Sequence, residues 1–301
     1  MKKFISHILK IYFFSVIILL GTFLLISIST KFTKKIESSL FQFGTLNGKL
    51  RERSIMFKEW VNIESENKIL FLGASTMYRN YNPEYLPKNY DGFNIGTSGM
   101  NIKIQEEIVK SFLNSNIDIF VLEVTPILWN FRRYETRKNW IQDWVNPKDK
   151  VVRKIAFESK RLKEYFQYMY SLKKFHVPSK YYPLKSENLS QLSKKGSDCI
   201  TGVKPFELSY QDYVLNLSKE NLSSLINLSR IKKKKILFVI NPNRELNYTL
   251  NNFPVNVFDF NDFIKLNNEH FNDEVHLNCS GLNQFSLESS KIIVSILEGD
   301  F

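Results

Sequence analysis

Short runs of apolar residues recur along this chain, and segments with helical periodicity separate them. Strands that are buried on both faces of a parallel sheet have such nearly continuous apolar runs, whereas half-exposed strands alternate apolar and polar positions. The strand pattern is found in residues 69–72, 92–96, 117–126, 236–242 and 255–260. The helical pattern is found in residues 48–61, 76–80, 102–113 and 281–297. This alternation predicts the α/β class, with a doubly wound, mostly parallel sheet of five strands.

The alternation is interrupted by about a hundred residues, from 128 to 235. A single loop of that length is unusual in a compact domain, so we predict a helical insertion that covers one edge of the sheet. Residues 132–174 are rich in aromatic side chains and contain thirteen Lys or Arg against five Asp or Glu, within a chain of formal charge +12. These basic residues are either solvated helix faces or a surface for an anionic glycan or anionic lipid headgroups. No nucleic-acid-binding module is visible, so no nucleic acid partner is expected.

The N-terminus contains an uncharged apolar run, residues 11–28, behind the basic leader MKKFISHILK. The run is just long enough to cross a bilayer core of about 30 Å. A cleaved signal peptide is the alternative, but no A-x-A-like site follows, so we favour an uncleaved anchor. Lysines on the two sides nearly balance, and the short leader favours a single-pass membrane protein with its C-terminal domain outside the cytoplasm. We therefore divide the chain into an anchor (1–35), a connector (36–67) and an α/β domain (68–301).

The two cysteines, Cys199 and Cys279, do not have the spacing of a metal site or a redox motif. They could pair if the domain lies in an oxidising compartment. We favour the simpler interpretation, in which both are small buried apolar side chains.

Candidate catalytic residues follow the first and the last of the predicted strands in chain order. Ser75 follows the first strand at the turn Gly73-Ala74-Ser75, and open α/β sheets bind ligands at this edge. Serine is also a preferred helix N-cap, which is the competing role. Asp273 and His276 follow the last strand and are three residues apart, so the carboxylate could hold one imidazole nitrogen while the other faces a nucleophile. Right-handed crossovers would bring both ends to one edge of the sheet.

Three blocks in this order resemble the SGNH (GDSL-like) hydrolase superfamily. The first is 73–75, where Ala74 replaces the family's Asp; the second is 94–99, where Gly96 matches a backbone donor to the oxyanion; the third is 273–278, the closing D-x-x-H. The family's Gly-x-Asn-Asp block after the third strand is missing, and LEVTP stands in its place. Its oxyanion-binding Asn therefore has no counterpart in this sequence.

The resemblance covers residues 68–126 and 236–297 and implies a flavodoxin-like SGNH fold. It also implies acyl transfer through a seryl ester on Ser75, with His276 as general base and Asp273 orienting the imidazole.

The backbone N–H groups of Ser75 and Gly96 would then stabilise the oxyanion. Asn94 and Glu123 are predicted to line the site, and no metal or other cofactor is required.

A membrane anchor with this triad is similar to the cell-envelope branch of the family, which includes proteins of polysaccharide O-acetylation and of teichoic acid D-alanylation. The expected function is that of an esterase or O-acyltransferase. Its partners would be an acyl donor, an envelope glycan acceptor and an acyl-transfer protein in the membrane. The alternative is a catalytically degenerate glycan-binding or scaffold protein on the same fold, since Ala74 and the missing Asn depart from the family pattern.

Overall fold

The computed structural model describes residues 10–22, 47–124, 144–145, 195–202, 213–216, 226–227, 230, 232–244, 248–251 and 257–299. The chain forms two compact units, which divide between Asn47 and Gly48. In the first unit, residues 10–22 form a helix with exposed apolar side chains. None of the described helices is both long and apolar enough to cross a membrane. The predicted span continues to residue 28, outside the described residues, and stays a prediction.

A sheet of five parallel strands forms the centre of the second unit, in the order β2-β1-β3-β5-β7. The strands are β1 (Lys68–Leu72), β2 (Asp91–Asn94), β3 (Ile119–Glu123), β5 (Lys235–Ile240) and β7 (Val257–Asp259). Each coincides with one of the predicted apolar runs, so the α/β class and the five strands are confirmed. The strand order reverses beside β1, the position at which open α/β sheets place ligands.

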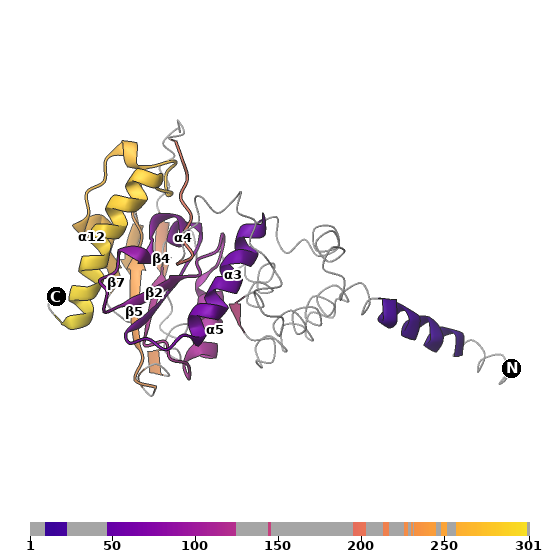
Figure 1. Cartoon of the computed structure of the whole chain (residues 1–301). Helices are drawn as coiled ribbons and strands as arrows, with labels where there is room; N and C mark the ends of the chain where they lie inside the picture. The colour runs from indigo at the N-terminus through magenta and orange to yellow at the C-terminus, as the bar shows by residue number, and fades with distance from the viewer. Residues whose placement is uncertain are drawn as a thin grey trace. The chain divides into compact units, whose positions relative to one another are not determined.

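Helices cover both faces of this sheet (Figure 1). Helix α12 (Cys279–Glu298) lies on one side, and α3 (Asn47–Asn62) and α5 (Ile102–Phe112) lie on the other. The short helix α4 (Ser75–Asn80) packs against α12, and α11 (Phe260–Phe263) follows β7. Two 3-10 turns lie at Pro83–Tyr85 and Asn268–His270.

The two layers of helices explain why the central strands have apolar side chains on both faces of the sheet. Ile69 and Phe71 of β1 belong to a core that also contains Phe285 of α12, whereas Leu70 and Leu72 point to the opposite face. These four residues of β1 are each at most 1% exposed.

Helix α3 belongs to the α/β unit, although we predicted a connector over residues 36–67. Its Phe57 and Trp60 are 1% and 4% exposed, and their rings lie 5.5 and 5.6 Å from the ring of Phe93 in β2. Lys68, the buried first residue of β1, donates from Nζ to the carbonyl of Trp60 (2.6 Å) and so caps the end of α3. The sequence did not show this docking because the same periodicity also fits a helix with one solvated face.

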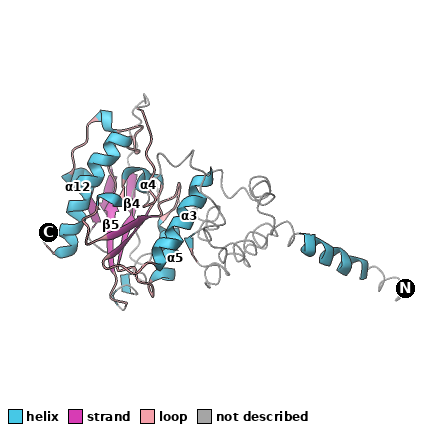
Figure 2. Cartoon of the chain, in the orientation of Figure 1, coloured by secondary structure: helices cyan, strands magenta, loops and turns pink. Residues whose placement is uncertain are grey.

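Most of the predicted helical insertion lies outside the described residues. One described part of it is a strand: β4 (Tyr213–Asn216) pairs in parallel with β6 (Tyr248–Asn251) as a second, two-stranded sheet. Figure 2 labels β4 and draws the strands in magenta. The prediction of a helical insertion is therefore wrong at residues 213–216, where the run YVLN is too short for its periodicity to be recognised.

A disulfide joins Cys199 to Cys279, with a Cα–Cα distance of 4.9 Å. Our favoured interpretation of two separate buried thiols is therefore wrong. The segment 195–202 lies along the start of α12, where the Cys279 N–H donates to the carbonyl of Ile200 (2.9 Å). The two cysteines are 80 residues apart in the chain, so their proximity depends on the tertiary fold.

Candidate active site

Ser75 is the first residue of α4, directly after the turn that ends β1. Ala74 occupies the N-cap position, and no side chain caps the helix there. The hydroxyl of Ser75 instead lies 2.8 Å from Nε2 of His276. The alternative role of this serine as an N-cap is thus not what the structure shows.

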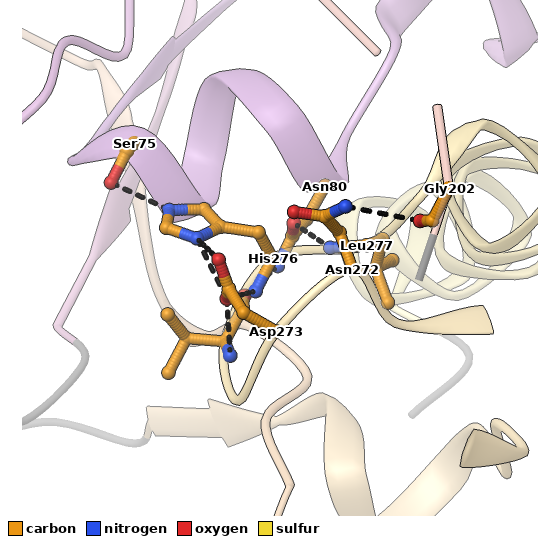
Figure 3. Close-up of polar contacts among 8 residues, drawn as sticks. Ser75, Asn80, Gly202, Asn272, Asp273, His276 and Leu277 are labelled. Carbon is orange, nitrogen blue, oxygen red and sulfur yellow. Dashed lines mark hydrogen bonds and ion pairs between the residues drawn. The ribbon is translucent and has the colours of Figure 1, made fainter. Parts of the chain in front are cut away.

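His276 lies between Ser75 and Asp273 in the loop that precedes α12 (Figure 3). Its Nδ1 is 2.8 Å from each carboxylate oxygen of Asp273. An ionised carboxylate only accepts hydrogen bonds, so the neutral imidazole carries its proton on Nδ1. Nε2 is then the acceptor for the Ser75 hydroxyl, which is the arrangement needed to withdraw its proton.

The surroundings of Asp273 keep it ionised. Partial burial by itself raises the pKa of the Asp273 carboxyl, but hydrogen bonds and charge interaction with His276 and the backbone N–H groups of Val275 and His276 outweigh that effect and lower the pKa to about 2. Oδ1 accepts these two N–H groups at 3.1 and 2.9 Å. Asp273 can therefore hold the Nδ1 proton and stabilise an imidazolium without itself taking the proton.

Glu123, predicted to line the site, is fully buried beneath the Ser75 turn. Its Oε2 accepts the backbone N–H of Ala74 (2.7 Å), and its Oε1 accepts the hydroxyl of Thr76 and the amide of Asn241 (2.9 Å). The carboxylate therefore holds the residues on both sides of Ser75 and joins the ends of β1, β3 and β5. It does not face a substrate, because these protein donors surround it.

Asn94, also predicted to line the site, is buried and satisfies backbone groups instead. Its Nδ2 donates to the carbonyls of Met77 (2.9 Å) and Tyr81 (2.8 Å), at the end of α4. Helix ends leave carbonyls without partners, and Asn94 provides donors for them. Its position beneath α4 excludes it from the lining of the site.

The backbone N–H of Gly96, the predicted oxyanion donor, donates to Oδ1 of Asn94 (2.9 Å). Its carbonyl accepts Nη2 of the buried Arg53 (2.7 Å). Gly96 packs closely on α4: a Cβ at this position would lie 2.9 Å from the Met77 Cβ and 3.0 Å from the Ala74 carbonyl oxygen. The structure therefore explains this glycine by close packing and does not support the predicted role of its N–H.

The N–H of Ser75 is the better candidate for an oxyanion donor. The first N–H groups of a helix have no partner within the helix. Among the described residues, no hydrogen bond from this N–H to a backbone acceptor outside the helix is found. The structure thus leaves one of the two predicted oxyanion donors available.

Sequence reasoning missed the residues that support the triad. Asn241, the residue after β5, is 1% exposed and bonds to Glu123. The available signal was that Glu123 ends the apolar run of β3 and Asn241 follows that of β5. Buried polar groups at two strand ends require partners, and these two residues are partners of each other.

Comparison of the chain with protein-family models, with characterised proteins and with solved structures finds no match. The resemblance to SGNH hydrolases therefore depends on the sequence motifs alone.

Proposed function

We propose that this protein is a serine esterase or O-acyltransferase of SGNH type. The observation that carries the proposal is the hydrogen-bonded chain from Ser75 through His276 to Asp273, assembled from residues about 200 positions apart. Nδ1 of this imidazole is held by a carboxylate, and Nε2 faces the hydroxyl of a serine at the end of β1. That is the arrangement of an activated serine nucleophile.

The mechanism follows from the three side chains. The Ser75 oxygen bonds to the acyl carbon as its proton passes to Nε2 of His276, and Asp273 stabilises the resulting imidazolium. The N–H of Ser75 stabilises the negative oxygen of the tetrahedral intermediate. His276 then gives its proton to the leaving oxygen, which departs and leaves a seryl ester. In the second half of the reaction, water or a sugar hydroxyl attacks that ester as His276 takes its proton. The bond between the Ser75 oxygen and the acyl carbon then breaks, and His276 returns the proton to Ser75.

We propose an extracytoplasmic location for the α/β unit and a single membrane anchor at residues 11–28. The Cys199–Cys279 disulfide supports the location, since disulfides persist in oxidising compartments. The helix over residues 10–22, whose apolar side chains are exposed, supports the anchor. The acceptor would be a cell-envelope polysaccharide, for which the basic residues within 132–174 provide charge complementarity, and the acyl donor would be delivered by a membrane partner.

The class of reaction is tested with the full chain in detergent and 4-nitrophenyl acetate as acyl donor. We expect release of nitrophenolate and an acetyl group on Ser75, detected by mass spectrometry after acid quenching. Ser75→Ala and His276→Ala should abolish both. Hydrolysis at an equal rate by Ser75→Ala would exclude the proposal.

A second candidate function is a glycan-binding or scaffold protein with a degenerate site. The observation that favours it is the Gly96 N–H, which is bonded to Asn94 and so leaves the oxyanion site with fewer donors. This candidate predicts that His276→Ala retains function in cells and retains binding to the envelope polymer. Loss of cellular function with unchanged binding would exclude it.

A further inference from the structure

Asn80 contacts the backbone on both sides of His276. It is the last residue of α4 and is 0% exposed. Its Nδ2 donates to the carbonyl of Val275 (2.8 Å), and its Oδ1 accepts the N–H of Leu277 (2.9 Å), as Figure 3 shows for Leu277. One amide side chain thus holds the peptide groups before and after His276.

Ser75 and Asn80 are the two ends of the same short helix. A helix of this length is a single short element of fewer than two turns. Ser75 and Asn80, which holds the loop that carries His276, therefore move together. A shift of α4 relative to the sheet would carry both, which keeps the distance from the Ser75 hydroxyl to His276 constant.

The other hydrogen bonds of the His276 loop do not connect it to α4. The Asn272 N–H donates to the His276 carbonyl (2.7 Å) within the loop, and the Asn272 side chain donates to the carbonyl of Gly202 (3.0 Å). Among the described hydrogen bonds, those of Asn80 are the ones that tie this loop to α4, apart from the Ser75–His276 contact itself.

We propose that Asn80 is a positioning residue that sets Nε2 of His276 against the Ser75 hydroxyl. The role needs a donor and an acceptor on one short side chain, which Asn provides and neither Asp nor Leu can replace. Asp at this position would keep the bond to the Leu277 N–H but would place a second acceptor against the Val275 carbonyl. The proposal rests on the proposed function, because Asn80 acts through His276.

The test compares Asn80→Ala and Asn80→Asp with Asn82→Ala in the full chain. Asn82 is a matched control, since it is 7% exposed, lies just after α4 and bonds to Glu84 instead of the His276 loop. The first readout is the rate at which a fluorophosphonate labels Ser75. We expect both Asn80 variants to react about 100-fold more slowly than Asn82→Ala, because small displacements of a reacting group have effects of that size.

Urea unfolding separates positioning from a general loss of stability. The Asn80 variants should label slowly without urea, under conditions in which each is still fully folded. Slow labelling only in a variant that is already unfolded, or an Asn80→Ala rate equal to that of Asn82→Ala, would overturn the proposal.

A second readout does not depend on reactivity at Ser75. Hydrogen exchange at the Leu277 amide should be at least about tenfold faster in Asn80→Ala than in Asn82→Ala, since its acceptor is removed. Unchanged exchange would overturn the contact on which the proposal depends. Absence of labelling in the wild-type chain would instead exclude the proposed function, and the exchange data would still decide whether Asn80 holds the loop.

Discussion

The carboxylate of Glu123 occupies the space in which a side chain at Gly73 would lie. A Cβ on Gly73 would be 2.3 Å from Oε2 of Glu123 and 2.6 Å from the Cβ of Met77. Gly73 of the Gly-x-Ser turn is thus required because a side chain there would clash with Glu123, which holds the turn. Residues 73 and 123 form a matched pair, in which a small residue admits a buried anion that fixes the positions next to Ser75.

Glu123→Gln should destabilise the fold and slow acylation of Ser75. The Glu123 carboxylate accepts hydrogen bonds from three donors. In the Gln variant, the NH2 group would face at least one of these donors and could not accept its hydrogen bond. We expect a loss of about 2–4 kcal/mol in the free energy of unfolding, measured in urea. Glu107→Gln, a partly exposed change on α5, is the control and should cost no more than about 0.5 kcal/mol. Equal stability of the two variants would contradict the assigned role of Glu123.

Gly73→Ala should be harmful although the change is small. The added methyl group would clash with Glu123 and Met77, neither of which has space to move in the packed core. We expect a cost of about 1–3 kcal/mol together with loss of the Ser75 reaction. Gly299→Ala serves as a control for space, because nothing lies within 4 Å of a Cβ there, although its positive φ favours glycine. Wild-type reactivity in Gly73→Ala would show that Glu123 can leave the turn without consequence.

Asp273 should give a pH-dependent contribution to stability. The pKa of its carboxyl is about 2 in the folded protein, below the ordinary value of about 3.9, so the unfolded chain binds the proton more tightly. The stabilisation is complete above about pH 5 and is lost as the pH falls through the folded pKa of about 2. The stability difference between wild type and Asp273→Asn should therefore be largest above about pH 5 and shrink on acidification.

Urea unfolding at several pH values measures this difference, with Asp262→Asn, an exposed change on α11, as the control. A difference that stays constant from neutral to acid pH would contradict the assignment. The same Asp273→Asn variant should acylate Ser75 about 10³–10⁴-fold more slowly, because the imidazole loses the partner that fixes its tautomer.

Removal of the disulfide should loosen the start of α12. Cys279 lies three residues after His276, and the bond closes a loop of 80 residues. Replacing both cysteines by serine should cost about 2–4 kcal/mol in the free energy of unfolding. The reductant dithiothreitol should lower the stability of the wild type and leave the double variant unchanged. A reductant effect of equal size in both proteins would mean that the bond does not contribute.

The fold was predictable to the extent that local pattern determines it. Strands buried under helices on both faces must be apolar at consecutive positions, and β1, β3 and β5 show this plainly. The docking of α3 was not predictable, because the periodicity of Phe57 and Trp60 fits a solvated helix as well as a packed one. The Cys199–Cys279 contact depends on the path of segment 195–202, which no local pattern encodes.

The candidate site was likewise predictable only in part. Ser75, Asp273 and His276 could be proposed from spacing and chain order, because strand ends gather at one edge of a parallel sheet. The directions of the supporting side chains could not be proposed. Glu123 and Asn94 stand at strand ends like site residues, yet each turns inward toward backbone groups that need a partner.

The central claim, an activated serine at position 75, is tested most directly by fluorophosphonate labelling of the full chain followed by peptide mapping. The account predicts one adduct, on Ser75, that forms in the wild type and is lost in His276→Ala. No adduct on Ser75, or an adduct that forms equally fast without the imidazole, would contradict it.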